Sequence, residues 1–202
     1  MKPGNVALAF TGASGAPYGL RLLETLLKAG REVHLMVSTP GRLVINTETD
    51  WNLPADNRAM RELFCERFQA DPELLHIYGK EQWMAPIASG SNAPEAMVIC
   101  PCTTATLSAV ATGASRSLIE RAADVALKEK RKLILVIRET PFSEIHLENM
   151  LKLARMGAVI MPANPGFYHR PDSVDGLVDY MVARVLDHLG VENSLMPRWS
   201  EA

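Results

Sequence analysis

Short runs of almost entirely apolar residues recur along the chain, and segments with helical periodicity separate them. A strand with one face in water alternates polar and apolar residues, whereas an uninterrupted apolar run indicates a strand buried on both faces of a parallel sheet. The predicted strands are Val6–Phe10, Val33–Val37, Ala96–Cys100, Leu133–Ile137 and Ala158–Met161, with Leu75–Tyr78 as a weaker sixth. The alternation predicts a three-layer α/β fold with a doubly wound, Rossmann- or flavodoxin-like parallel sheet.

The clearest helix is the last one, in which apolar residues recur at i, i+3, i+4 and i+7 between Val174 and Leu189. The other predicted helices are approximately Pro17–Ala29, Pro40–Glu48, Asn57–Phe68, Leu118–Glu129 and Ser143–Met156. No repeat, low-complexity tract or linker interrupts this pattern. We therefore expect one domain over residues 1–202, with a loop-like tail at 192–202.

Composition excludes several classes of protein. The chain has 21 Lys and Arg against 23 Asp and Glu, a net charge of −2, which argues against a nucleic-acid partner. Its 48% hydrophobic content argues against disorder. The three cysteines are too few for a disulfide framework, and no apolar run is long enough for a membrane span or a signal peptide. We expect a cytoplasmic protein.

Ligands of open parallel sheets bind beyond the carboxyl ends of the strands, so the residues after each strand are the candidates for chemistry. The turn Thr11–Gly19 is rich in Gly and Ala and opens a helix, an arrangement that suits a phosphate. Its spacing is not that of the dinucleotide fingerprint, and no acid follows the second strand, which disfavours NAD. Ser14 and Ser38 would either contact a ligand or simply cap the helices that follow them.

The segment Thr103–Thr106 follows the next strand and offers hydroxyl groups to a ligand. Cys100 and Cys102 lie just before it. They lack the further ligands of a zinc site and a neighbouring His, so we interpret them as small buried thiols. We predict no metal site.

Charged residues follow the later strands. Arg138 suits bidentate recognition of phosphate, and Glu139 is able to move a proton. Tyr168 follows the last strand, and Arg184 borders the apolar stripe of the last helix. Each of these groups has a less specific interpretation as a solvated side chain.

Arg121 and Lys128 are seven residues apart, so they share one face of their helix and would extend an anion site if that helix reaches it. Together, the donors after the strands are sufficient for two phosphate groups rather than one. They indicate a phosphorylated cofactor beside a phosphorylated substrate.

Several blocks of the sequence resemble the UbiX-type flavin prenyltransferases, which share the fold of the homo-oligomeric flavin-containing cysteine decarboxylases. The resemblance extends from about Val6 to Trp199. The blocks are Thr11–Ala16 with Tyr18-Gly19, Ser89–Ser91, Cys100–Thr103, Ile119–Glu129, Arg138–Pro141, Glu144–Met150 and Pro165–Tyr168.

The resemblance implies a reaction that joins FMN to a dimethylallyl group from dimethylallyl monophosphate without a metal. Reduced FMN is the acceptor, bonds form at flavin N5 and C6, and a UbiD-type decarboxylase uses the product, prenylated FMN. It further implies a homo-oligomer, a dodecamer, with sites at subunit contacts.

The same resemblance implies roles for individual residues. The FMN-binding residues would be Gly12, Ala13, Ser14, Ser38, Thr103, Thr104, Ala105, Thr106 and Arg138. The ligands of the prenyl phosphate would be Tyr168, Arg184, Arg121 and Lys128. Ser14 and Glu139 would move protons, Glu48 would line the cleft and Trp199 would close over it.

Two alternatives use the same fold: an FMN-dependent decarboxylase or oxidoreductase, and an FMN carrier without chemistry of its own. The sequence leaves open the receiving decarboxylase and its pathway, the choice between monophosphate and pyrophosphate, and the oligomer number. It also leaves open the roles of Cys100, Cys102 and His169.

Overall fold

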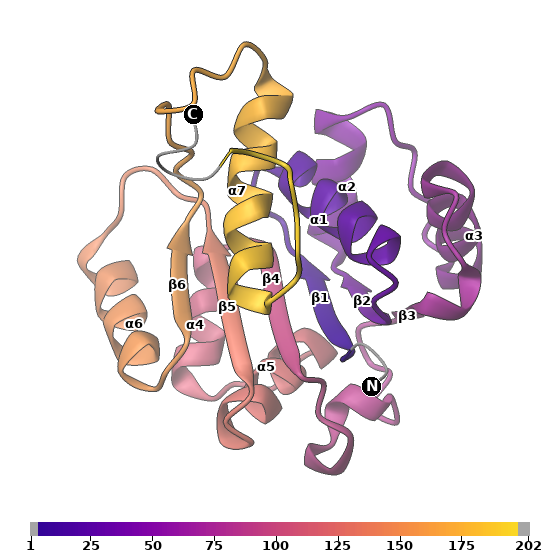
Figure 1. Cartoon of the computed structure of the whole chain (residues 1–202). Coiled ribbons are helices and arrows are strands. Elements are labelled where there is room, and N and C mark those ends of the chain that lie inside the picture. Colours follow the sequence, from indigo (N-terminus) through magenta and orange to yellow (C-terminus); the bar gives the residue numbers. More distant parts are fainter. Residues whose placement is uncertain (1–3, 198–202) are drawn as a thin grey trace.

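The computed structural model describes residues 4–197, which form a six-stranded sheet in which every neighbouring pair is parallel (Figure 1). The strands are β1 (Val6–Phe10), β2 (Val33–Val37), β3 (Leu75–Tyr78), β4 (Ala96–Cys102), β5 (Lys132–Ile137) and β6 (Val159–Pro162). Their order is β3-β2-β1-β4-β5-β6, so the direction of winding reverses between β1 and β4. This is the order of Rossmann-type sheets, and the predicted doubly wound fold is confirmed.

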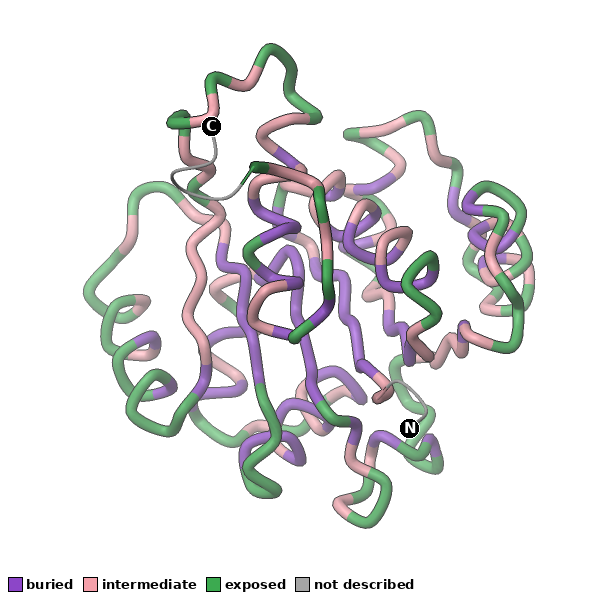
Figure 2. Tube along the Cα trace, viewed as in Figure 1, coloured by how far each residue is buried: buried purple, intermediate pink, exposed green. Residues whose placement is uncertain are grey.

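Helices cover both faces of the sheet. The face shared by Val6, Leu8 and Phe10 packs against α1 (Ala16–Lys28), α2 (Thr39–Glu48), α3 (Asn57–Phe68) and α7 (Val174–Leu189). The opposite face packs against α4 (Thr104–Thr112), α5 (Leu118–Lys128) and α6 (Glu144–Arg155). Short 3-10 turns occupy Pro72–Leu74, Pro86–Ala88 and Gly90–Asn92. Figure 2 shows the central strands buried between these two layers, as their uninterrupted apolar runs predict.

The sequence did not predict α4. Helical periodicity is weak there because Thr, Ser and Ala alternate with few large apolar residues, although Leu107 and Val110 are buried. The preceding strand β4 also continues two residues past the predicted end, to Cys102. As a result, Thr103 is the N-cap of a helix, and its side chain accepts a hydrogen bond from the backbone N–H of Thr106.

None of the helices within residues 4–197 has both the length and the apolar character needed to cross a lipid bilayer.

Thr11 joins the ends of β1 and β4 at the point where the winding reverses. Its Oγ1 donates to the carbonyl of Pro101 at 2.7 Å and accepts the backbone N–H of Thr103 at 2.9 Å. The side chain is only 4% exposed, so water does not replace either bond. The two turns that follow β1 and β4 therefore have a fixed separation.

Replacing Thr11 by Val should lower the free energy of unfolding by about 1–3 kcal/mol, because it leaves the buried backbone N–H of Thr103 without its acceptor and removes one of the two hydrogen bonds to the Pro101 carbonyl. Urea unfolding measures this loss. The control is Thr25→Val, which removes a hydroxyl that bonds only the carbonyl of Arg21 in its own helix. Equal losses in the two variants would show that Thr11 does not hold the strand ends together.

Candidate active site at the carboxyl edge of the sheet

Glu48, at the end of α2, reaches back to the turn between β1 and α1. Its Oε2 accepts the backbone N–H groups of Gly15 and Ala16, each at 2.9 Å, and the side chain of Ser14 also bonds this carboxylate. Gly15 precedes α1 with φ of 110°, a conformation that favours glycine. Glu48 thus supplies the acceptor that the start of α1 lacks in its own N-cap residue.

The same contacts determine the charge of Glu48. Burial alone would raise the pKa of the carboxyl group, but the hydrogen bonds from Ser14, Gly15 and Ala16 and the nearby charge of Arg138 lower the pKa below the ordinary value. The carboxylate is therefore ionised near neutral pH. Because it is ionised, the Glu48 carboxylate accepts a hydrogen bond from the hydroxyl of Ser14. The lone pairs of Ser14 Oγ are then available to accept other hydrogen bonds.

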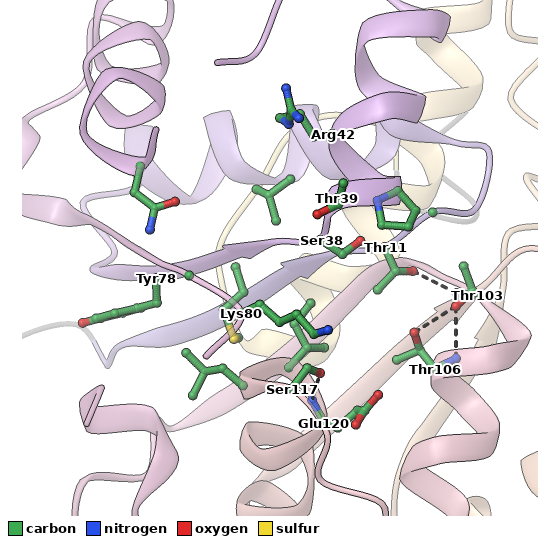
Figure 3. Close-up of a pocket in the computed structure, with 18 of the residues that line it drawn as sticks. Thr11, Ser38, Thr39, Arg42, Tyr78, Lys80, Thr103, Thr106, Ser117 and Glu120 are labelled. Atoms are coloured by element: carbon green, nitrogen blue, oxygen red, sulfur yellow. Dashed lines mark hydrogen bonds between the residues drawn. The ribbon is translucent and has the colours of Figure 1, made fainter. Parts of the chain in front are cut away.

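A cavity of about 580 Å³ lies beside this turn, between the ends of β1, β2 and β4 and the starts of α2 and α5 (Figure 3). Five of the predicted FMN-binding residues line it, namely Gly12, Ser38, Thr103, Ala105 and Thr106. A Cβ atom at Gly12 would lie 2.5 Å from Cβ of Pro40, so only glycine lets the turn approach α2 this closely. The predicted gathering of small and hydroxyl residues is observed.

The helices that begin at this cavity have capped N-termini. Ser38 Oγ accepts the N–H of Gly41 at 3.0 Å, and Thr103 Oγ1 accepts the N–H of Thr106 at 3.0 Å. Ser117 caps α5 in the same way through the N–H of Glu120. Ser38 and Thr103 thus cap helices as well as line the cavity. The positive ends of three helices converge on it.

Arg138 and Glu139 follow β5 at the same edge. The backbone N–H of Arg138 bonds the carbonyl of Cys102 at 3.3 Å. Its Nε is buried and has no hydrogen-bond partner among the described residues. A buried guanidinium N–H without an acceptor is costly, and an anionic ligand would satisfy it.

The carboxylate of Glu139 lies across from the start of α4. Its Oε2 accepts a long hydrogen bond, 3.5 Å, from the hydroxyl of Thr104, and its Oε1 accepts the backbone N–H of Thr140 at 3.1 Å. Of the predicted FMN-binding residues, Thr104 therefore contacts a predicted catalytic side chain rather than the cavity.

Tyr168 lies on the loop after β6, and Arg184 lies on α7. Tyr168 follows β6 in an exposed loop, with 76% of its surface accessible. Arg184, on α7, forms an ion pair with Asp187, with 2.7 Å between Nη1 of Arg184 and Oδ2 of Asp187, and the Arg184 side chain is half exposed. Both side chains are thus accessible to solvent.

Two predicted ligands do not reach this edge within one chain. Arg121 donates from Nε to the carbonyl of Ala88 and pairs with Asp124 at 3.0 Å. Lys128 is the last residue of α5, close to the amino end of β5, where it pairs with Glu129. Arg121 thus faces the Pro86–Ala88 turn, and Lys128 lies at the opposite end of α5 from the cavity. Their role as ligands of the prenyl phosphate, directly or across a subunit contact, stays a prediction. Trp199 lies outside the described residues.

The thiols lie in the core. Burial raises the pKa of Cys100 far above its ordinary value and raises the pKa of Cys102 to about 12. Both residues are buried free thiols, which confirms their interpretation as packing residues. Within residues 4–197, no group of three or more His, Cys, Asp or Glu side chains is placed to hold a metal ion.

The cavity also contains residues that the sequence did not identify. Lys80, Tyr78 and Arg42 line it, and Figure 3 shows the Lys80 side chain extending across it. Lys80 follows β3 just as Ser38 follows β2. Because ligands bind beyond the carboxyl ends of strands, Lys80 could have been predicted as a site residue, but β3 was the weakest predicted strand. Ser117 carries no such signal, because its place depends on how α5 packs.

Comparison with known proteins identifies the family. A family model described as Flavoprotein matches residues 1–186. Flavin prenyltransferase UbiX of Pseudomonas aeruginosa is 60% identical over 199 residues, which cover 98% of this chain and 95% of that protein. The chain belongs to the UbiX flavin prenyltransferase family.

Solved structures agree with this assignment. AnUbiX (PadA1) in complex with FMN and dimethylallyl pyrophosphate matches with a TM-score of 0.86 and 39% identity, covering 97% of each chain. A dodecameric FMN-dependent Ubix-like decarboxylase from Escherichia coli O157:H7 matches with a TM-score of 0.84 and 41% identity, covering 96% of this chain and 98% of that one. The resemblance drawn from the sequence is confirmed.

In this flavin prenyltransferase, Glu48→Gln should lower the free energy of unfolding near neutral pH. The folded-state pKa of Glu48 is below its ordinary value, so the stabilisation is complete above the ordinary value, roughly 4.3, and disappears as the pH falls through the lower folded-state pKa. Urea unfolding of both proteins across this range should show their difference shrinking in acid.

The control for this series is Glu62→Gln, which removes an exposed carboxylate whose ion pair with Arg58 lies within one helix. A Glu48→Gln difference that grows toward acid, or that matches the control at every pH, would contradict the role of Glu48 as acceptor for the turn.

Proposed function

We propose that this enzyme transfers a dimethylallyl group from dimethylallyl monophosphate to FMN without a metal ion, and that a UbiD-type decarboxylase uses the prenylated product. The observation that carries the proposal is the buried Nε of Arg138, for which the described part of the chain offers no hydrogen-bond partner. It lies at the edge that also holds the Ser14–Glu48 pair and Glu139, so an anion bound there is adjacent to groups that are able to move protons.

The residues present fit FMN. Gly12, Ser38, Thr103 and Thr106 combine close backbone approach, hydroxyl groups and helix N-termini, which suits the phosphate and the polyol chain. Lys80 adds a cation to the same cavity. Ala13, Ser14, Thr104, Ala105 and Arg138 would hold the ring system. Reduced FMN supplies two nucleophilic atoms, N5 and C6, to which the prenyl group becomes attached.

Protein cations would take the place of a metal at the departing phosphate. Two guanidinium groups and one hydroxyl group are candidates for this role. The guanidinium groups belong to Arg138, directly after β5, and to Arg184 on α7, and the hydroxyl group belongs to Tyr168 in the loop after β6. The ion pair of Arg184 with Asp187 is half exposed, and such pairs contribute only about 0–1 kcal/mol. Arg184 is therefore able to turn toward a phosphate at little cost.

Arg121 and Lys128 would act at the site of a neighbouring subunit. Both lie on α5 away from the rim of their own chain, which suits a role across a subunit contact. The relative from Escherichia coli O157:H7 is a dodecamer, and we propose the same assembly here. We place the enzyme in the cytoplasm, since its cysteines are free thiols.

The two carboxylates would divide the proton chemistry. Ser14 would accept a proton from the bound flavin at its Oγ while its own hydroxyl proton passes to the ionised carboxylate of Glu48, which orients it. Glu139 would carry a proton to the departing phosphate. Trp199 would close over the site and exclude water from the reactive allylic group.

Mass spectrometry of the bound flavin tests the proposed reaction. The protein is incubated anaerobically with reduced FMN, dimethylallyl monophosphate and a metal chelator, and the flavin should gain one dimethylallyl unit. Unmodified FMN in repeated, fully reduced trials would reject transfer and favour a carrier. Product formed only after a divalent metal is added would reject the metal-free mechanism. A parallel reaction with the pyrophosphate distinguishes the two donors.

Glu139→Gln should slow turnover by about 10²- to 10⁴-fold, the usual contribution of a positioned general acid or base, with no change in FMN affinity. Single-turnover rates and FMN titration measure the two quantities. The control is Glu144→Gln, which alters an exposed carboxylate a few residues further along the chain. Rates equal to those of the unmodified enzyme would remove the proton-transfer role of Glu139.

A further inference from the structure

We propose that Tyr180 on α7 is a positioning residue for the phosphate ligands. It holds the loop that carries Tyr168 against the helix that carries Arg184. The roles of Tyr168 and Arg184 as ligands come from the proposed function, and the inference rests on it to that extent. The anchoring of the loop is a property of the protein alone and is measurable without any ligand.

The first contact is a ring stack between the loop and the helix. The rings of His169 and Tyr180 lie 5.5 Å apart with an angle of 8° between their planes. Both ring nitrogens of His169 are buried and have no hydrogen-bond partner within the described part of the chain. Hydrogen bonds from this ring therefore do not fix the loop, and the flat packing on Tyr180 is what holds His169 in place.

The second contact is at Gly166. A Cβ atom at this position would lie 3.0 Å from both Cζ and the hydroxyl oxygen of Tyr180. The φ angle of Gly166 is outside the left-handed region, so space, not backbone conformation, is what favours glycine here. The loop thus meets the Tyr180 ring both before and after Tyr168.

On α7, the Tyr180 ring is held in place by packing. Tyr180 packs against the buried cluster between the sheet and α7, whereas Tyr168 is largely exposed. Arg184 follows Tyr180 by four residues and lies on the same face of α7. One anchored ring therefore sets the distance between a loop ligand and a helix ligand. Figure 2 shows how exposed most of this loop is above the buried stripe of α7.

Loss of the ring should weaken binding of the prenyl phosphate, because the loop must then be ordered when the ligand binds. The cavity assigned to FMN lies at the ends of β1, β2 and β4 and includes neither Tyr180 nor the loop. FMN affinity should therefore not change. This difference separates positioning of the phosphate ligands from a general loss of structure.

Binding and hydrogen exchange of the full-length protein test the proposal. Tyr180→Leu, loaded with oxidised FMN so that no transfer occurs, should bind dimethylallyl monophosphate about three- to tenfold more weakly in calorimetry. Amides of residues 163–173 should exchange faster in the ligand-free variant. Tyr180→Phe keeps the ring and should restore both values. The control is Asp179→Asn, which alters the adjacent residue and breaks its 2.7 Å pair with Arg21 on α1 instead.

Gly166→Ala approaches the same contact from the loop side, and it keeps the test valid if Tyr180→Leu folds poorly. Alone it should weaken phosphate binding, because the added methyl group displaces the Tyr180 ring. Combined with Tyr180→Leu it should add little, since the ring it displaces is absent. Fully additive effects, or unchanged exchange at 163–173 in both single variants, would overturn the proposal. If the unmodified protein fails to bind the prenyl phosphate, the proposed function fails, whereas the exchange measurement still decides whether Tyr180 anchors the loop.

Discussion

The positions of the carboxyl ends of β1 and β4 determine where the residues of the candidate site lie. Because the winding reverses between them, the connections that follow leave in opposite directions and a crevice opens at the edge of the sheet. Thr11 closes the base of this crevice, since its hydroxyl bonds both Pro101 and Thr103. The turn that carries Ser14 and the start of α4 are thus placed relative to each other by one buried side chain.

Local groups, not overall charge, must attract the phosphate groups. The whole chain has a net charge of −2, which does not favour an anion. The edge of the sheet differs from the average because three capped helices begin at the cavity and Arg138 has a buried N–H group that finds no acceptor in residues 4–197. Capping keeps these helix ends ordered, so their dipoles have fixed directions before a ligand arrives.

The sequence predicted most of the fold and which strand ends carry the candidate residues. Buried parallel strands have a strong signal, and residues directly after them, such as Ser38 and Arg138, are placed by topology alone. Contacts between residues that are far apart in the sequence leave no comparable pattern in the sequence. The bond from Glu48 to the α1 turn joins residues more than thirty positions apart, and the direction of α5 carries Lys128 away from the rim. Only packing determines these features.

The different surroundings of the two carboxylates explain why they would have different roles. Glu48 accepts three hydrogen bonds and lies near a guanidinium, so its pKa is low and it has no proton to give near neutral pH. Its carboxylate instead holds the Ser14 hydroxyl by a hydrogen bond. Glu139 accepts one backbone N–H and one long bond from Thr104, and it is the residue next to Arg138. Within the proposed function, delivery of a proton to a phosphate bound at Arg138 is therefore assigned to Glu139 rather than to the ionised Glu48.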